Sequence, residues 1–433
     1  MASSLNPRTT SYEFLGPPGA FAISIGVPII TQALYFGCSE VAGGCPPNIS
    51  FDALSTKVVH SLSNPSWWKG LWDNEAALIY AAWYAFCVVA WAVLPGDQVE
   101  GTTLRNGKTL SYKINAFTTF LLALGVTSGI ILRSGPEAFT FIYNKWVGLV
   151  TASVANAFVQ ATYCYITSFR EGKLLASGGN SGNFIYDWYI GRDLNPRIGS
   201  FDIKSFNELR PGLILWVLIN ISMVCEQATR LGGLSKVTDS MWLVLCFQTW
   251  YVADGLFNEP ALFTTMDITT DGFGFMLAIG DLTYVPFVYS LQARYLAWNP
   301  VELGPVNTLA VLAVNFLGYY IFRTANGEKN DFRNGNNPKN LQFMETKRGT
   351  KLLTSGWWGR SRHPNYMGDL IMGLAWSLPT GFNTPITYFY VIYFSVLLIH
   401  RQRRDDEACA HKYGNDWKTY TKLVPYRIIP YIY

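Results

Sequence analysis

The sequence has few charged residues for its length. Asp, Glu, Lys and Arg make up 14% of the 433 residues, against 50% hydrophobic residues. Average protein sequences carry about 25% charged residues. The formal net charge is only +4, and the basic residues gather in particular loops. This composition argues against a soluble protein and against nucleic acid as a partner.

Residues that bind metals are also scarce. Four His are too few for the multi-His iron site of the membrane desaturase kind, and the seven Cys show no zinc-ligand spacing. We therefore predict no metal site. Cys38 and Cys45 lie in one short loop, where a disulfide would form if the loop faces an oxidising compartment.

The sequence lacks the motifs of the common nucleotide-binding and hydrolase folds. No Gly-x-Gly-x-x-Gly follows a predicted strand, and there is no Walker A motif and no Gly-x-Ser-x-Gly elbow. We therefore predict that the chain has no Rossmann domain and binds any nucleotide in another way.

Long apolar segments, in contrast, recur along the whole chain. They predict an all-α, polytopic membrane protein with about ten transmembrane helices. Several segments are short or contain Gly, Pro and polar residues, which is tolerated where helices line a cavity. The predicted spans are 20–36, 76–94, 116–131, 146–165, 211–227, 241–252, 273–296, 307–322, 367–378 and 386–400.

The distribution of basic residues predicts the orientation of these spans. The even-numbered loops carry more Lys and Arg than the odd-numbered loops, and 323–362 carries the most. By the positive-inside rule, both termini and this loop are cytosolic. The loop after the first span is then lumenal, and it contains a glycosylation sequon at Asn48.

The polar interval 352–369 is unusually dense in hydrogen-bond donors and aromatic rings. Arg360 and Arg362 suit a phosphorylated ligand, because guanidinium groups pair with phosphate oxygens through two hydrogen bonds. Trp357 and Trp358 offer a face for stacking. A juxtamembrane aromatic belt with snorkelling arginines is the alternative, and it explains only part of the cluster.

Two flanking segments add to this cluster. Arg323, Lys329 and Arg333 directly follow a span, where they would attract an anion or serve as an ordinary positive-inside flank. If the last span continues as a helix, Asp405 and Cys409 follow each other on one face of that helix. A solvated amphipathic helix is the alternative for this second segment.

An acidic and glycine-rich segment lies beside and within the seventh span. Carboxylates there are costly unless they are paired or functional, and a desolvated carboxyl group suits a proton donor. The candidate acids are Glu259, Asp267 and Asp271. Gly272, Gly274 and Gly280 would let a flat, rigid ligand approach the backbone; close helix packing, with the acids in salt bridges, is the alternative.

Six stretches of the sequence resemble the sterol reductase family of the endoplasmic reticulum, most closely its fungal-type delta-14 branch. They are Asn-Pro-Arg-Ile-Gly (195–199), Thr-Met-Asp-Ile-Thr-Thr-Asp-Gly-Phe-Gly-Phe-Met-Leu-Ala (265–278), Pro-Phe-Val-Tyr-Ser-Leu-Gln-Ala-Arg-Tyr-Leu (286–296), Leu-Leu-Thr-Ser-Gly-Trp-Trp-Gly (352–359), Arg-His-Pro-Asn-Tyr-Met-Gly-Asp (362–369) and Leu-Val-Pro-Tyr-Arg-Ile-Ile-Pro-Tyr-Ile-Tyr (423–433).

The resemblance implies a ten-helix enzyme of the endoplasmic reticulum membrane that uses NADPH. Residues 1–209 would form four helices and a cytosolic loop, and 210–433 would form the reductase half with the sterol pocket and the NADPH site. The expected partners are the sterol, membrane lipid and other enzymes of sterol biosynthesis. Carried onto matching positions, the NADPH ligands are Lys329, Arg333, Leu353, Trp358, Asn365, Tyr366, Asp405, Cys409, Tyr413 and Tyr420.

The implied reaction is reduction of the C14–C15 double bond of a sterol intermediate in ergosterol-type biosynthesis. An acid would protonate C15, and NADPH would deliver hydride to C14. Asp267, Asp271 and Glu259 are the acid candidates, with Tyr251 or Tyr289 as relays.

The sequence is also compatible with three other functions. One is a reductase of another sterol double bond, delta-7 or delta-24(28). Another is a non-catalytic sterol-binding membrane protein. A third is a methyltransferase of the isoprenylcysteine type, which would use S-adenosylmethionine.

Overall fold

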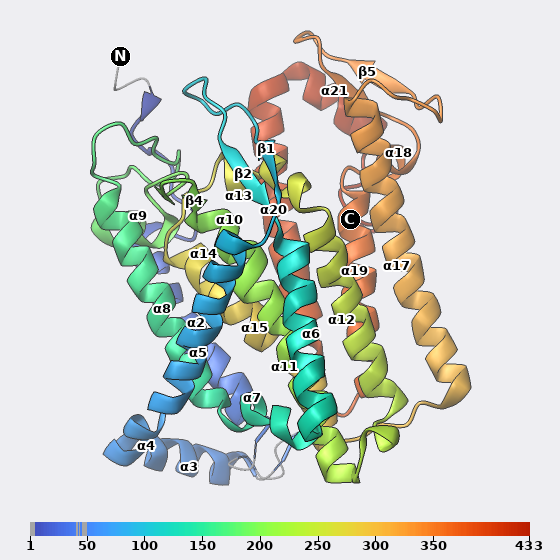
Figure 1. The fold of residues 1–433 in the computed structure, drawn as a ribbon. Coiled ribbons are helices and arrows are strands. Elements are labelled where there is room, and N and C mark those ends of the chain that lie inside the picture. The colour runs from blue at the N-terminus through green and yellow to red at the C-terminus, as the bar shows by residue number, and fades with distance from the viewer. Residues whose placement is uncertain (1–4, 40–41, 43, 46–49) are drawn as a thin grey trace. The chain divides into compact units, whose positions relative to one another are not determined.

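A computed structural model describes residues 5–39, 42, 44–45 and 50–433 (Figure 1). The chain is mainly helical and forms two compact units. The first unit runs to Val237 and includes Gln248–Pro300; the second comprises Thr238–Phe247 and Val301–Tyr433.

Polar residues and prolines fix where several helices of the first unit begin. Asp73 accepts hydrogen bonds from the backbone N–H groups of Glu75 and Ala76 at the start of α5, and Asp202 accepts one from Ser205 in α10. The helices are α2 (Gly16–Phe36), α3 (Phe51–Ser63), α4 (Pro65–Gly70), α5 (Asn74–Val93), α6 (Ala116–Ser134), α7 (Phe141–Asn144), α8 (Trp146–Thr167), α9 (Phe184–Ile190), α10 (Ile203–Asn207), α11 (Leu213–Leu231), α13 (Met266–Thr269), α14 (Phe275–Ile279), α15 (Val285–Val288) and α16 (Leu291–Trp298).

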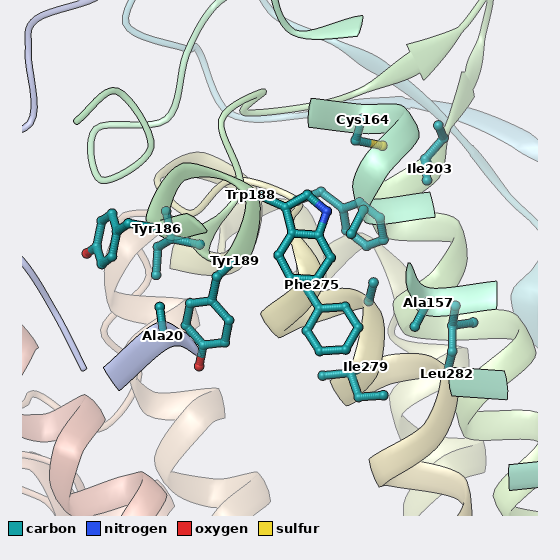
Figure 2. Close-up of a cluster of buried hydrophobic side chains, with 14 residues drawn as sticks. Ala20, Ala157, Cys164, Tyr186, Trp188, Tyr189, Ile203, Phe275, Ile279 and Leu282 are labelled. Atoms are coloured by element: carbon teal, nitrogen blue, oxygen red, sulfur yellow. The ribbon is translucent and has the colours of Figure 1, made fainter. Parts of the chain in front are cut away.

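Short aromatic helices form the packing centre of the first unit around α9 and α14. Trp188 stacks on Phe275 with ring centroids 4.7 Å apart, and its indole N–H donates to the hydroxyl of Thr162 on α8. Figure 2 shows this stack with Ile279 next to the ring of Phe275. The cluster therefore joins α8, α9 and α14 in one apolar core.

The predicted seventh span, 273–296, is broken in the structure. It consists of α14, a π-helical segment Gly280–Tyr284, α15 and α16. A second π-helical segment, Glu208–Gly212, joins α10 to α11, and the two π-helical segments contact each other. Such bulges in otherwise regular helices occur frequently at functional sites.

The second unit is built on three long helices (Figure 1). α17 (Gly304–Arg333) packs along α19 (Pro364–Ser377), and α19 packs against α20 (Phe389–Tyr413). Asp239 lies at the start of α12 (Asp239–Phe257), which contributes to both units, and its carboxylate accepts the backbone N–H groups of Leu303 and Gly304, both at 2.9 Å. The second unit also contains α18 (Trp357–Arg360) and α21 (Asn415–Leu423).

The strands of the described residues form three separate two-stranded antiparallel ladders. β1 (Asp97–Glu100) pairs with β2 (Ser111–Ile114), and β3 (Arg197–Ile198) pairs with β4 (Phe201–Asp202). In the second unit, β5 (Phe343–Glu345) pairs with β6 (Lys351–Leu353). The fold class predicted from the sequence is therefore confirmed as mainly helical.

Six helices of the described residues are long and apolar enough to cross a membrane. They are Gly16–Phe36, Pro65–Val93, Ala116–Ser134, Trp146–Thr167, Ile203–Leu231 and Gly304–Arg333. Each overlaps a predicted span; the total of ten stays a prediction. The last predicted span does continue as a helix, because α20 runs to Tyr413. Cys38 and Cys45 form a disulfide, whereas Asn48 lies outside the described residues.

Candidate functional site

A cavity of about 660 Å³ lies in the second unit, between the end of α17, β6, α18, the start of α19, α20 and α21. All ten positions predicted to bind NADPH line it: Lys329, Arg333, Leu353, Trp358, Asn365, Tyr366, Asp405, Cys409, Tyr413 and Tyr420. The structure therefore brings together residues that lie up to 91 positions apart in the sequence. Their role as ligands stays a prediction.

The end of α17 contributes two cations to this cavity. Lys329 and Arg333 are one helical turn apart and so face the same side of α17. The ammonium group of Lys329 lies 4.1 Å from the ring centroid of Trp358, whose indole N–H donates to the carbonyl oxygen of Ala325. Trp358 is thus fixed as an aromatic wall beside a positive charge.

The segment before α19 contributes a stacked pair of rings. His363 and Tyr366 are parallel within 12°, with centroids 4.8 Å apart, and α19 begins at Pro364 between them. Burial lowers the pKa of the His363 imidazole to about 3, and the nearby positive charges of Lys329 and Arg362 act in the same direction. His363 is therefore neutral at physiological pH.

This shifted pKa predicts an acid-sensitive stability. An unfolded histidine takes up a proton below pH 6.5, whereas folded His363 does so only near pH 3. The free energy of unfolding is therefore not reduced by His363 above pH 6.5, and it decreases as the pH falls from 6.5 toward 3. Replacing His363 by Gln removes this loss. Between pH 7 and pH 5.5 we expect the variant to lose about 1 kcal/mol less stability than the original protein. Apparent melting temperatures across this pH range test it.

His411 provides the control for the pH experiment, because its side chain is exposed on α20. His411→Gln should keep the acid sensitivity of the original protein. An equal effect of both substitutions would contradict a special role of His363.

α20 forms another wall of the cavity. Asp405, Cys409 and Tyr413 follow one another at four-residue intervals and share one face of the helix. The phenol O–H of Tyr366 donates to the carboxylate of Asp405 at 3.4 Å. Burial raises the pKa of both the Asp405 carboxyl and the Cys409 thiol, so Cys409 is an uncharged thiol in this wall. Burial also raises the pKa of Tyr420 to about 12.

The two arginines of the polar interval 352–369 have different surroundings in the structure. Arg362 is buried, lines the cavity and forms an ion pair with Asp406 at 3.2 Å, whereas the guanidinium of Arg360 lies 5.0 Å from the ring centroid of Trp357. The backbone conformation at Ser361 is extended, so the helical turn α18 ends between the two side chains. The cavity lining therefore includes Arg362 but not Arg360, and the expected binding of a phosphorylated ligand stays a prediction.

The cavity also contains residues that the sequence prediction omitted as ligands. Lys351 on β6, Lys412 on α20 and Trp417 on α21 line it. Trp417 had a signal in the sequence, because Tyr413, Trp417 and Tyr420 recur at helical spacing. Lys351 had no such signal in the sequence, because a lysine at the start of a short strand is ordinarily solvent-exposed.

Glu259, the first of the three candidate acids, is fully buried in the first unit. One carboxylate oxygen accepts from the guanidinium of Arg210 at 2.9 Å, and the other accepts from the backbone N–H of Ala116 at 2.8 Å. Ala116 is the first residue of α6, where a carboxylate also interacts favourably with the helix dipole. Both oxygens of Glu259 are therefore engaged.

Asp267 and Asp271 are half-buried at the two ends of a short turn around α13. The fully buried ammonium group of Lys204 donates to the backbone carbonyl oxygens of both, at 2.5 Å and 2.7 Å, and to that of Ile268 at 3.1 Å. Lys204 therefore holds the turn that carries both acids. The sequence prediction counted it only as a loop charge that sets topology.

The candidate relay tyrosines both lie near Trp216 in the first unit. The ring centroids of Tyr251 and Tyr289 are 6.2 Å and 5.3 Å from that of Trp216, and the indole N–H of Trp216 donates to Gln248. The amide of Gln248 in turn donates to the carbonyl oxygen of Tyr289. Their predicted role as relays stays untested.

The glycines beside Asp271 allow close packing of two backbone segments. A Cβ atom on Gly272 would lie 2.0 Å from the carbonyl oxygen of Gly191, and one on Gly274 would lie 2.3 Å from the Gly191 nitrogen. Gly191 itself has φ +96°, which only glycine adopts readily. These contacts favour the packing explanation for Gly272 and Gly274 over approach of a flat ligand.

This packing predicts that an added methyl group destabilises the protein at Gly274 but not at Gly280. Gly274→Ala should lower the apparent melting temperature by the equivalent of about 1–3 kcal/mol, because backbone atoms must move to admit the methyl group. Gly280→Ala is the control, since no atom of the described residues lies within 4 Å of its Cβ position. Equal melting temperatures for the two variants would contradict the packing explanation.

A second, smaller cavity of about 200 Å³ lies in the first unit. Its walls are almost entirely apolar and come from α5, α6, α7, α8 and α11, with Phe139 and Phe287. Among the described residues, no group of three His, Cys, Asp or Glu side chains is placed to hold a metal ion.

Comparison with known proteins gives a consistent assignment. The model of the ergosterol biosynthesis ERG4/ERG24 family matches residues 8–433. The chain is 51% identical to the delta(14)-sterol reductase erg24 of Schizosaccharomyces pombe over 98% of this chain and 97% of that protein. It is 46% and 45% identical to the delta(14)-sterol reductases ERG24 of Saccharomyces cerevisiae and Candida albicans, over the full length of each pair. The chain therefore belongs to the ERG4/ERG24 family of ergosterol biosynthesis.

Proposed function

We propose that the protein is an NADPH-dependent reductase of the C14–C15 double bond of a sterol intermediate in ergosterol-type biosynthesis. The observation that carries the proposal is the single 660 Å³ cavity lined by all ten predicted cofactor positions. The delta(14)-sterol reductases to which the chain is similar support the choice of double bond.

The cavity fits a dinucleotide in size and in chemistry. Its volume falls in the range of small-molecule sites, about 300–1,000 Å³. Two buried atoms in its wall, Nε of Arg362 and Oδ1 of Asn365, have no hydrogen-bond partner among the described residues. A buried polar atom without a partner costs free energy, so a polar ligand at this position would stabilise both.

The residues of the cavity divide by chemistry into two groups. Lys329, Arg333 and Arg362 provide positive charge for phosphate groups, the arginines through paired donors and the lysine as a point charge. Trp358 and Tyr366 provide aromatic faces for flat rings. When bound, NADPH would supply the hydride that reduces C14. Neutral His363 fixes the ring of Tyr366 by stacking without adding positive charge.

For the proton we rank Asp267 and Asp271 above Glu259. Protonation of C15 must precede or accompany hydride transfer, because an isolated alkene is not electrophilic. Lys204 binds the backbone of Asp267 and Asp271 and so holds the turn around α13. This turn determines where the two carboxyl groups lie. Glu259 would first have to leave Arg210.

The wider assignment from the sequence is part of the same proposal. It includes ten spans, no Rossmann domain, both termini in the cytosol, the endoplasmic reticulum membrane, and association with other enzymes of sterol biosynthesis. It also assigns the cofactor and sterol sites to residues 210–433.

Isotope transfer tests the reaction directly. Purified protein is incubated without oxygen with NADPH deuterated at the transferring position and with an 8,14-diene, a 5,7-diene or a 24(28)-ene sterol. We expect deuterium at C14 of the first sterol alone, read by mass spectrometry. Label in another sterol would mean that the protein reduces a different sterol double bond. No label in any sterol, despite NADPH binding, would mean that the protein binds sterols without reducing them.

A further inference from the structure

The segment 424–433 follows α21 and lies along the loop that carries His363. The backbone N–H of Arg362 donates to the carbonyl oxygen of Tyr426 at 2.9 Å, and that of His363 donates to the carbonyl oxygen of Arg427 at 2.8 Å. Two consecutive residues of the cavity wall are thus hydrogen-bonded to this segment.

The segment then turns back on itself. The carbonyl oxygen of Tyr433 accepts from the backbone N–H groups of Arg427 at 2.7 Å and Ile428 at 3.0 Å. Ile428 is buried, whereas Tyr431 and Ile432 in the turn are 87% and 79% exposed. The turn therefore returns the side chain of Tyr433 toward Arg427.

Five side chains form a polar cluster that begins at the cavity wall with Arg362, and we call it the tail cluster: Arg362, Gln402, Asp406, Arg427 and Tyr433. The phenol oxygen of Tyr433 accepts from Nη1 of Arg427 at 3.0 Å and donates to Oε1 of Gln402 at 3.3 Å. Nε2 of Gln402 donates to Oδ2 of Asp406 at 2.6 Å.

The same carboxylate oxygen of Asp406 holds two guanidinium groups. Nη2 of Arg362 lies 3.2 Å from it, and Nε of Arg427 lies 3.6 Å from it. Nη1 of Arg362 also donates to the carbonyl oxygen of Val424 at 3.3 Å. These polar contacts join Arg362 to α20 and to the segment 424–433.

Arg362 is the member of this cluster that lines the cavity, and Gln402 and Asp406 lie on another face of α20. Gln402 and Asp406 are one turn apart on the face that meets the segment, and Asp405 and Cys409 are one turn apart on the face that lines the cavity. The segment therefore fixes the cavity wall from behind, through α20 and through the loop at 362–363.

We propose that Arg427 and Tyr433 are positioning residues for the cofactor pocket. They orient Arg362 through Asp406, and they hold His363 and hence the ring of Tyr366 that stacks on it. The inference rests on the proposed function, because it assigns the effect to NADPH affinity.

The test is NADPH binding by Tyr433→Phe and Arg427→Ala in the full chain. Tyr433→Phe removes one oxygen atom and with it the hydrogen bonds to Arg427 and Gln402, so we expect the Kd for NADPH to rise about threefold to tenfold. Arg427→Ala should raise it by about tenfold or more. Arg427→Lys, which keeps the charge near Asp406, should recover part of the affinity.

The control is Ile432→Ala in the same segment, which is expected to bind NADPH as the original protein does, because its side chain is exposed. The melting temperature without cofactor separates positioning from folding: it should stay the same for Tyr433→Phe and Ile432→Ala. An unchanged Kd in Tyr433→Phe and Arg427→Ala would overturn the inference, as would an equal rise in Ile432→Ala. Absence of NADPH binding by the original protein would instead overturn the proposed function.

Discussion

Replacing the proton-donating acid by Asn is expected to lower turnover of an 8,14-diene sterol about 10²- to 10⁴-fold, which is the usual contribution of a general acid. We expect this loss in Asp267→Asn or Asp271→Asn. The double bond becomes electrophilic only on protonation, so NADPH alone is not able to reduce it. The Kd for NADPH should stay the same, because the cofactor cavity is lined by residues of the second unit.

The structure makes these substitutions informative. Lys204 binds backbone carbonyl oxygens of Asp267, Ile268 and Asp271, and an Asn side chain leaves these bonds in place. The turn should therefore keep its conformation while it loses one acid. Initial rates at saturating NADPH, together with the melting temperature, distinguish a lost proton donor from a lost fold.

Glu259→Gln provides the contrast. It removes the negative charge opposite buried Arg210, and breaking a buried ion pair in this way costs about 3–5 kcal/mol. We therefore expect a marked loss of melting temperature in this variant. Stable but inactive Glu259→Gln, with both Asp variants turning over normally, would reverse our ranking of the acids.

The cavity of the second unit was largely predictable from the sequence because its residues lie in short segments with regular spacing. Lys329 and Arg333 are one turn apart on a single helix, as are Asp405 and Cys409, so local periodicity already places each pair on one face. The family resemblance then supplied the relation between these segments, which periodicity does not contain.

The environment of the candidate acids was not predictable in the same way. Lys204 and Asp267 are 63 residues apart, and Arg210 and Glu259 are 49 apart. Each pair meets only through tertiary packing, and in the sequence a lysine near a span is indistinguishable from a topology signal. Gly272 and Gly274 were ambiguous for the same reason, because their partner is the distant backbone of Gly191.

The second large effect is expected at Lys329. Lys329→Met should raise the Kd for NADPH about 10- to 100-fold, since hydrogen bonds to charged groups contribute about 1.5–3 kcal/mol. Met keeps an unbranched side chain that packs against Trp358, which the ammonium group of Lys329 contacts at 4.1 Å. The melting temperature without cofactor should therefore change little, and calorimetric titration measures the loss of affinity.

Lys347→Met is the matched control, because it removes the same charge from an exposed side chain outside the cavity lining. Salt adds a second criterion. If Lys329 acts through its charge on a phosphate group, the affinity of the original protein should fall as ionic strength rises, and that of Lys329→Met should fall less steeply. Equal salt dependence in both would mean that the charge of Lys329 does not act on the ligand, and an equal loss of affinity in Lys347→Met would mean that Lys329 contributes general positive potential and not a direct contact. A Kd unchanged in Lys329→Met would remove the lysine from the binding site altogether.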